Sequence, residues 1–261
     1  MNYNTPAQIA EEFAASGIYK TSLSTRKFCI IAILGGVFIA FGGLLSVMVA
    51  GGSPGIGAEN PGIIKFIAGA LFPIGLMMVS ITGADLFTSD CTAFTLPLLQ
   101  KRIKINLFIR FLLLSYVFNF IGAQLVAYVF SSGIDFFAND PWKSYLHHYS
   151  EAKVNQDFLK VFIKGIGANW LVCLGMWMGY AGKDIIGKCI GIWIPVMLFV
   201  TLGYEHSIAN MFFIPAAIYS GADILWSDFI VRNLLPATLG NFIGGAFFVG
   251  CVYWYIYLKD K

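Results

Sequence analysis

Six long apolar segments constrain this chain more than any other feature of its sequence. A helix needs about 20 apolar residues to cross the hydrocarbon core of a bilayer. The chain is 58% hydrophobic and 12% charged, whereas a soluble domain carries about 25% charged residues. The sequence therefore predicts an all-α membrane protein with six transmembrane helices. The segments run from about Phe28 to Ala50, Ile63 to Leu99, Leu107 to Phe130, Phe158 to Ala181, Ile185 to Tyr219 and Leu234 to Leu258.

The second and fifth segments are too long and too often interrupted to be single helices. We expect each to be a broken helix with a loop inside it, at TGADLFTSD (Thr82–Asp90) and at GYEHSIAN (Gly203–Asn210). Non-helical backbone at membrane depth is tolerated only where protein buries it or where it lines a cavity. Each following half-helix is expected to begin near a serine, Ser89 or Ser207, because serine caps helices well. The free backbone N–H groups of such broken helices suit a small anion.

The two broken segments also resemble each other. In each, an acid follows a glycine by two residues, and the acids Asp85 and Glu205 are 120 positions apart. The third segment contains NFIGA from Asn119 and the sixth contains NFIGG from Asn241, 122 positions apart. Two matches at nearly one offset predict two related halves of three helices each. An odd number of crossings inverts the second half, and inverted repeats with paired broken helices place a transport site between the breaks.

These halves define the predicted domain organisation. The N-terminal arm has a weakly amphipathic pattern from about Pro6 to Ile18, which we expect to form a short helix at the membrane surface. A single transmembrane channel domain follows and contains both repeats. The predicted boundaries are 1–27 for the cytoplasmic N-terminal region, 28–258 for the channel domain, about 28–130 and 158–258 for the repeats, and 259–261 for a cytoplasmic tail.

The basic residues predict the orientation. Eleven lysine and arginine residues lie in or near the N-terminal arm, the loops after the second and fourth segments, and the tail, and six lie on the other side. By the positive-inside rule, both termini are cytoplasmic and the protein crosses the plasma membrane several times. The net charge of +3 is small and spread over the loops, and no nucleic-acid partner is predicted. The five cysteines lie outside metal-ligand spacings, so neither a metal site, a cofactor nor a disulfide framework is predicted.

Two polar residues within apolar segments are candidates for function. His206 is the only histidine in an apolar segment, and an ionisable residue at membrane depth is a functional hypothesis by default. The alternative is a histidine that its neighbours satisfy and that only holds the loop in shape. Asn169 could either bond a neighbouring helix or reach His206 across the pore, and the sequence favours neither.

The paired loop residues are interpreted as structural. Gly83 and Gly203 belong to the two loops, and Asp85 and Glu205 follow them by two residues. Each acid could accept backbone N–H bonds or pair with a basic group, and so hold its break in place.

Several stretches resemble the formate/nitrite transporter family, namely FPIGLMM, GADLFTSD, KGIGANWLVCLGMW, GYEHSIANMFFIP and NLLPATLGNFIGG. They follow the family's order along nearly the whole chain. GADLFTS, EHSIANMFFIP and the YWYIYLKD tail are most similar to the formate channels, although the nitrite and hydrosulfide branches share most of this core. The resemblance implies an aquaporin-like fold and a homopentamer with one pore per protomer. It also implies a small monovalent weak-acid anion as substrate, with formate favoured.

The resemblance also implies roles for particular residues. The central histidine falls on His206, its hydrogen-bond partner on Asn169, and the threonine of the first loop on Thr88. The lysine of the outer vestibule falls on Lys153, and residues Thr5 to Gly17 match the helix thought to gate the cytoplasmic mouth. The family's acid and asparagine beside the histidine fall on Glu205 and Asn210, and its constriction residues fall on Phe72, Leu76, Leu86, Phe87 and Phe199.

A hypothesis of mechanism follows from solvation. A bare anion would lose too much hydration in a dry constriction, whereas a neutral acid would not. We expect Lys153 and the half-helix dipoles to draw the anion into a vestibule, where desolvation favours its protonation. Whether His206 donates the proton or only a hydrogen bond stays open at this stage, as does the choice among formate, nitrite, hydrosulfide and lactate-like acids.

Two other classes of protein compete with this interpretation. A water or glycerol pore fits the inverted repeat, but the paired Asn-Pro-Ala breaks of such pores do not occur in the sequence. An intramembrane enzyme or a structural subunit is the second rival, with His206 and Glu205 as an acid–base pair. Neither a nucleophile nor a metal cluster accompanies that pair, so no enzymatic activity is predicted.

Overall fold

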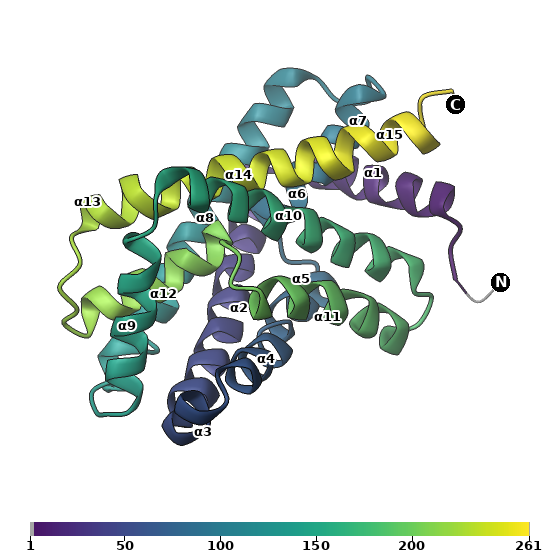
Figure 1. The fold of residues 1–261 in the computed structure, drawn as a ribbon. Coiled ribbons are helices and arrows are strands. Elements are labelled where there is room, and N and C mark those ends of the chain that lie inside the picture. The colour runs from purple at the N-terminus through teal and green to yellow at the C-terminus, as the bar shows by residue number, and fades with distance from the viewer. Residues whose placement is uncertain (1–2, 261) are drawn as a thin grey trace.

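The computed structural model describes residues 3–260, and these residues form a bundle of helices (Figure 1). Within this part of the chain, the only β contact is an isolated bridge between Tyr3 and Gly182. The predicted all-α class is confirmed. The helices are α1 (Pro6–Ser22), α2 (Thr25–Gly51), α3 (Pro54–Glu59), α4 (Pro61–Leu71), α5 (Ile74–Thr82), α6 (Phe87–Ala93), α7 (Thr95–Leu99), α8 (Ile105–Tyr128), η1 (Ser132–Ile134), α9 (Trp142–Val154), α10 (Phe158–Ala181), α11 (Ile185–Thr201), α12 (Ser207–Tyr219), α13 (Trp226–Asp228), η2 (Phe229–Leu234), α14 (Leu235–Gly245), η3 (Ala246–Cys251) and α15 (Val252–Tyr257).

The apolar segments of the sequence correspond to these helices. Five helical stretches among the described residues are long and apolar enough to cross a membrane, namely Thr25–Gly51, Pro61–Thr82, Ile105–Ile134, Phe158–Ala181 and Trp226–Tyr257. The fifth predicted segment is divided into two shorter apolar helices, α11 and α12. Many large apolar side chains on the outside of the bundle are exposed, including Leu113, Ile121 and Ile163. Such a belt is the surface that a bilayer or neighbouring protomers would cover.

Both breaks in the helices are present and each begins at a glycine in the left-handed region. Gly83 has φ 76° and Gly203 has φ 67°, which side chains with a Cβ rarely adopt. The half-helix after the first break begins at Phe87, two residues before Ser89, and its N-cap is Leu86, so the prediction that Ser89 caps it is wrong. The second begins at Ser207, but the N-cap is His206 and not the serine.

Asn119 on α8 holds the first break in place. Its Oδ1 accepts the backbone N–H of Phe87 at 2.8 Å. Its Nδ2 donates to the carbonyl oxygens of Asp85 at 2.9 Å and Ala32 at 2.7 Å. A buried side chain therefore satisfies the backbone groups that the broken helix leaves without partners.

Asn241 on α14 makes the same three bonds at the second break. Its Oδ1 accepts the N–H of Ser207 at 2.7 Å, and its Nδ2 donates to the carbonyl oxygens of Glu205 and Gly165, each at 2.8 Å. The asparagine that begins each NFIG motif therefore serves the loop in its own half. This matched bonding is the structural form of the repeat predicted from the sequence.

The glycine of each NFIG motif brings two long helices close together. A Cβ on Gly122 would overlap the carbonyl oxygen of Ile33 on α2, and one on Gly244 would overlap that of Ile166 on α10. Small residues at these positions allow α2 to pack on α8 and α10 on α14.

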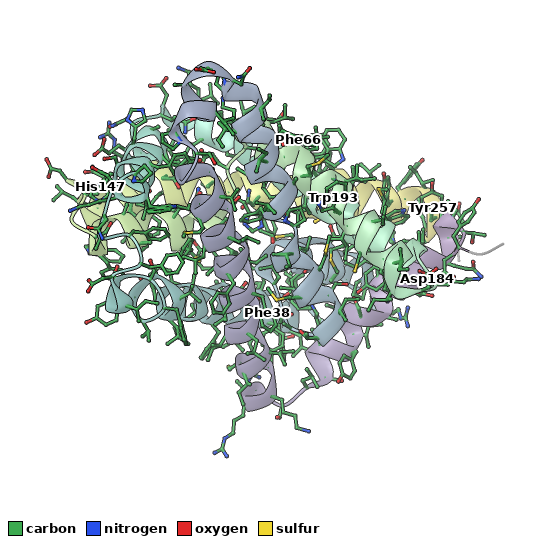
Figure 2. All side chains as sticks on the ribbon, turned by 90° about the horizontal axis from the view of Figure 1, so that it is seen from below. Phe38, Phe66, His147, Asp184, Trp193 and Tyr257 are labelled. Carbon is green, nitrogen blue, oxygen red and sulfur yellow. The ribbon has the colours of Figure 1, made fainter. Side chains whose placement is uncertain are left out.

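The N-terminal helix is longer than predicted and packs on the bundle. It begins after a capping box at Thr5 and ends at Ser22, and its buried face includes Ile9, Phe13 and Ala14. It contacts α6, α7 and α10. Helices α1 and α15 lie at one end of the molecule, and α9 and α13 lie at the other (Figure 1). His147 and the pair Asp184 and Tyr257 mark the same two ends in Figure 2. Lys261 of the predicted tail lies outside the described residues.

Candidate functional site between the two broken helices

The two broken helices touch at His206 and Thr88. His206 Nδ1 accepts the backbone N–H of Ala209 at 3.1 Å and so caps α12. Its Nε2 lies 3.0 Å from the hydroxyl of Thr88, which is in the first turn of α6. Both side chains are buried. The structure therefore joins the two loops through the histidine that the sequence singled out.

Asn169 supports Thr88 instead of contacting the histidine. Its Nδ2 donates to the backbone carbonyl of Thr88 at 3.0 Å and to that of Asn241 at 2.6 Å. The thiol of Cys173 lies 3.3 Å from the same Thr88 oxygen. The bond to His206 that the resemblance implied for Asn169 is not formed: Nδ2 donates to backbone oxygens of neighbouring elements, and Oδ1 lies 3.6 Å from the thiol of Cys173. Of the two alternatives, the structure has the bond to neighbouring helices.

Glu205, the residue before the histidine, lies in a buried polar cluster. Its Oε2 accepts from Lys153 Nζ at 3.0 Å, from Asn210 at 2.7 Å and from Asn233 at 3.3 Å. Its Oε1 accepts from Gln156 at 3.0 Å. The charges of one acid, Glu205, and one lysine, Lys153, therefore balance here, and each oxygen of the Glu205 carboxylate accepts at least one hydrogen bond. We call these five residues the outer cluster.

Lys153 brings a positive charge to the outer side of His206. It lies near the end of α9 and its Nζ is 4.9 Å from the centre of the Tyr149 ring and 5.9 Å from that of Phe213. Burial on its own would lower the pKa of Lys153, but the charge of Glu205, together with Tyr149 and the hydrogen bonds to both, outweighs burial, and the pKa is raised. The ammonium group therefore stays charged at every physiological pH.

A second cluster lies at the first break, on the side of the termini. Lys20 of α1 places its Nζ 2.7 Å from Asp85 and 2.6 Å from Asp90. The hydroxyl of Ser115 donates to the other oxygen of Asp85 at 2.6 Å. Burial would lower the pKa of Lys20, but the two aspartates outweigh it and raise the pKa above its ordinary value. We call Lys20, Asp85, Asp90 and Ser115 the inner cluster.

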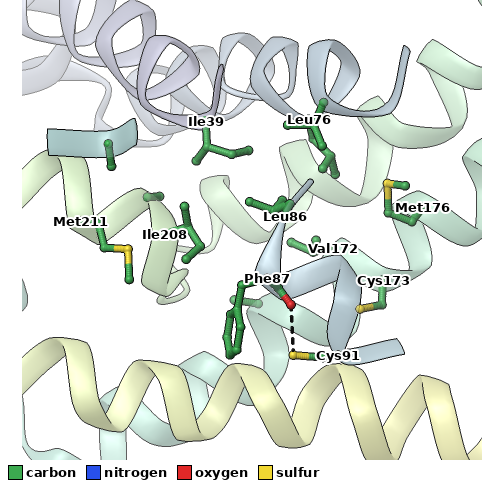
Figure 3. Packing of buried hydrophobic residues seen from close by; sticks show 14 of the residues in the cluster. Ile39, Leu76, Leu86, Phe87, Cys91, Val172, Cys173, Met176, Ile208 and Met211 are labelled. Carbon is green, nitrogen blue, oxygen red and sulfur yellow. Dashed lines mark hydrogen bonds between the residues drawn. The ribbon is translucent and has the colours of Figure 1, made fainter. Parts of the chain in front are cut away.

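Apolar side chains lie close to the histidine. The ring of Phe199 stacks on the imidazole of His206 with centroids 5.7 Å apart, and it meets Phe72 edge-on at 6.0 Å. Leu76 and Leu86 are buried and face each other beside the first break (Figure 3). The Phe199 ring therefore covers the imidazole of His206 with an apolar group.

Phe87 lies elsewhere. Its ring meets Tyr116 on α8 with centroids 4.9 Å apart, and in Figure 3 it extends away from Leu86 towards α14. Tyr116 in turn bonds Thr238 at 2.9 Å. The structure therefore separates Phe87 from the other residues assigned to a constriction, because consecutive residues at the start of α6 point to different sides.

Cavities approach the histidine from the two ends of the molecule. An outer cavity of about 80 Å³ is lined by Lys65, Tyr145, Tyr149 and Thr201 among others. A narrow space of about 10 Å³ continues from it to Lys153, Phe72, Phe199 and His206. An inner cavity of about 160 Å³ is lined by Lys20, Lys188, Gly83 and Ser89 among others. Within residues 3–260, no group of three His, Cys, Asp or Glu side chains is placed to hold a metal ion.

Comparisons with known proteins agree with this arrangement. The family model described as formate/nitrite transporter matches residues 7–255. The chain belongs to the formate/nitrite transporter family. It is therefore a membrane transport protein and not an enzyme, and the water-pore and enzyme interpretations are excluded.

Individual members of the formate/nitrite transporter family are similar over nearly their full length. A probable formate transporter of Methanothermobacter thermautotrophicus is 40% identical and the alignment covers 99% of each chain. The formate channel FocA of Escherichia coli strain K12 is 34% identical over 98% of this chain and 95% of its own. A solved pentameric formate channel with formate bound has a TM-score of 0.79 and 32% identity, covering 90% of this chain and 98% of that one. These matches confirm the predicted fold class.

The sequence reasoning missed several members of the two clusters in this formate/nitrite transporter. Lys20 was counted only as a charge for orientation, and Asp90 only as the end of a loop. Gln156 and Asn233 were not considered at all. Register within the repeat was an available signal, because Asp90 and Asn210 are 120 positions apart, as Asp85 and Glu205 are.

Proposed function

We propose that this chain conducts small monovalent weak acids, with formate as its preferred substrate. The observation that carries the proposal is the contact between His206 and Thr88, which lies between two cavities that are each lined by a lysine. Two relatives support formate as the substrate, one named as a probable formate transporter at 40% identity and one named as a formate channel at 34% identity.

The outer cavity collects the anion. Lys65 lines this cavity, and Lys153 lies in the narrow space that leads from it to His206. A concave, low-dielectric site with fixed positive charge raises the local concentration of anions. Tyr145 and Tyr149 line the same cavity and add hydroxyl groups that can donate to a carboxylate.

The apolar residues select the neutral form of the acid. Phe72 and Phe199 lie between the outer cavity and the imidazole, and Leu76 and Leu86 lie beside the first break. An unpaired carboxylate loses many kcal/mol of hydration in such a place and takes up a proton instead, on the order of several pKa units of change. The acid then crosses uncharged, and the proton travels with it.

His206 serves as a hydrogen-bond donor in this proposal. Its Nδ1 accepts the N–H of Ala209, so Nδ1 carries no proton in the capped helix. A neutral imidazole then has its hydrogen on Nε2, which faces the hydroxyl of Thr88. Protonating Nδ1 would break the cap and leave two N–H groups opposed. The proton that neutralises the anion therefore comes from the vestibule and its water.

The orientation and the assembly belong to the same proposal. Eleven of the basic residues lie on the side of the termini or in the elements next to it, which the positive-inside rule places in the cytoplasm. The outer cluster then faces the opposite side of the plasma membrane. A structural relative titled as a pentameric formate channel supports a homopentamer with a pore in each protomer. We retain the boundaries 1–27, 28–258 and 259–261 as the proposed division of the chain.

The test is transport by the purified protein in liposomes. Initial fluxes of formate, nitrite and hydrosulfide are compared, with the membrane potential clamped. The matched variant is His206→Asn, because asparagine also caps helices but cannot replace Nε2–H. We expect the formate flux to be the largest of the three. The formate flux of His206→Asn should be about tenfold lower than that of the wild type, because the loss of one hydrogen bond worth about 1.4 kcal/mol corresponds to a tenfold change. A larger flux of nitrite or hydrosulfide would assign the chain to another branch of the family, and an unchanged variant would remove the role of His206.

A further inference from the structure

The two lysine-containing clusters differ in their balance of charge. In the outer cluster Lys153 is paired with one acid, Glu205, and the position 120 residues from Asp90 is occupied by the uncharged amide of Asn210. In the inner cluster a single lysine is paired with two acids, Asp85 and Asp90. The halves are related, so this difference at one matched position is informative.

The inner carboxyl groups are buried together. Asp85 and Asp90 have no exposed surface, and Lys20 is mostly covered. Two ionised carboxylates on one ammonium group would leave a net negative charge in a dry site. Such an uncompensated charge is costly, and close pairs of carboxylates commonly share one proton instead.

The hydrogen bonds indicate which group holds the proton. Asp85 is paired with Lys20 at one oxygen, and its other oxygen accepts from Ser115 at 2.6 Å. Asp90 Oδ1 accepts a hydrogen bond from Lys20, whereas Asp90 Oδ2 is buried without a hydrogen-bond partner. Asp85 Oδ1 also forms no hydrogen bond, but Lys20 Nζ lies 2.7 Å from it as its ion-pair partner. A carboxylate oxygen without a donor is the natural place for a proton. Asp90 Oδ2, which has neither a hydrogen bond nor the ion pair of Asp85 Oδ1, is the oxygen best placed to carry the proton.

No other charged group in the surroundings resolves the imbalance. Lys188 lines the inner cavity beside Lys20, but within the described residues it forms no ion pair with either aspartate. Other titratable or hydroxyl groups face the inner cluster from the elements packed against it. They are Ser115, Cys91, Cys173, Tyr180 and, beyond Tyr180, Glu12. None of them brings a positive charge.

We propose that the inner cluster is a proton-binding site in which Asp90 is protonated while Asp85 and Lys20 form an ion pair. The site borders the inner cavity through Lys20. The outer cluster, with its single acid, holds no such proton. This inference rests on the proposed function and deepens it. The inner side of the proposed transport path then has a protonated acid next to it, and the outer side has none.

The test is infrared spectroscopy of the whole protein in lipid, because a protonated aspartic acid has a carbonyl stretch that an ionised one lacks. We expect the wild type to show one buried protonated carboxyl at neutral pH. Asp90→Asn removes the proton-holding group, and Asp85→Asn leaves one acid for one lysine, so both variants should lose the band. Asp223→Asn is the control, since Asp223 is exposed and should leave the band unchanged.

Other outcomes overturn the inference. If the wild type lacks the band, both acids are ionised and a bound monovalent cation is the alternative. A band that persists in Asp85→Asn would show that burial alone protonates Asp90 and that the pair does not share charge. Formate flux is measured on the same liposomes. If the wild type transports formate but lacks the carbonyl band, only this inference is contradicted. If the wild type shows the band but does not transport formate, only the proposed function is contradicted. Should Asp85→Asn fail to fold, Asp90→Asn with the Asp223→Asn control still decides the matter.

Discussion

The imidazole of His206 and the hydroxyl of Thr88 lie 3.0 Å apart and join the two broken helices of the bundle. They come from opposite halves of an inverted repeat, and each belongs to the first turn or cap of its half-helix. The contact therefore depends on both breaks being held in register. In the proposed function, the transport path therefore depends on the relative position of the two halves.

Replacement of Thr88 tests this contact. Thr88→Val removes the acceptor for His206 Nε2–H and leaves a buried donor without a partner, which costs about 1–3 kcal/mol. We expect a lower unfolding temperature and about a tenfold lower formate flux in liposomes. Thr88→Ser keeps the hydroxyl and is the control, and it should retain most of the flux. Equal fluxes for the valine and serine variants would contradict a role for the hydrogen bond.

Asn241 is predicted to be essential for folding. Asn241→Ala leaves the N–H of Ser207 and the carbonyls of Glu205 and Gly165 without the side chain that pairs them. Each buried group left unpaired costs about 1–3 kcal/mol. We expect a loss of several kcal/mol in stability and little folded protein in detergent, measured by thermal unfolding monitored on a sizing column. Asn139→Ala, at an exposed site, should unfold like the wild type, and similar behaviour of both variants would refute the assignment.

Lys153 is predicted to act on substrate capture. Lys153→Met removes the charge beside the outer cavity and leaves Glu205 buried without its cation, at a cost of about 3–5 kcal/mol. The double variant Lys153→Met with Glu205→Gln removes both charges and should recover most of the stability. It should still show a raised KM for formate, because the attraction is lost. A wild-type KM in the double variant would show that Lys153 is only structural.

The pH dependence of the outer cluster follows from the raised pKa of Lys153. A lysine whose pKa is higher in the folded state contributes stability below its unfolded pKa, and that contribution is lost as the pH rises through the folded value. The unfolded value is about 10.4. We therefore expect the Lys153–Glu205 pair to contribute undiminished to thermal stability between neutral pH and about pH 10. A titration of stability through neutral pH that disappears in the double variant would contradict this expectation.

The Phe72–Phe199 contact is predicted to set the size limit. Phe199→Ala removes the ring that stacks on His206 and meets Phe72, and loss of a buried ring costs about 3–5 kcal/mol of stability. In folded protein we expect the ratio of acetate or lactate flux to formate flux to rise severalfold. Phe87→Ala is the matched control, because its ring packs on Tyr116 away from this contact. An equal rise in both variants would argue against a local constriction.

Much of this fold is accessible from the sequence because apolar length and repeat spacing are local signals. The fourth segment matches α10 at both ends, and the fifth matches α11 together with α12. Gly83 and Gly203 were assigned to the two loops from the repeated pattern, and the structure shows both in the left-handed region that glycine adopts readily. The pairing of Asp85 and Glu205 with a basic group was also among the expected alternatives, and both pairs are formed.

The remaining features depend on contacts between distant parts of the chain. Lys20 and Asp85 are 65 positions apart, and only the packing of α1 against the bundle brings them together. The cap of α12 could not be read from Ser207, because the ring nitrogen of His206 does what a serine hydroxyl usually does. Asn169 and Phe87 depend on which way a side chain points, which spacing alone does not determine.

The central claim is that formate crosses as the neutral acid, so that each anion moves with one proton. The most direct test is to record formate uptake, internal acidification and current together in liposomes that contain the purified protein. We predict electroneutral uptake that acidifies the lumen in proportion to the formate taken up and that rises as the external pH approaches the pKa of formic acid. An electrogenic formate current without acidification, independent of external pH, would contradict the account.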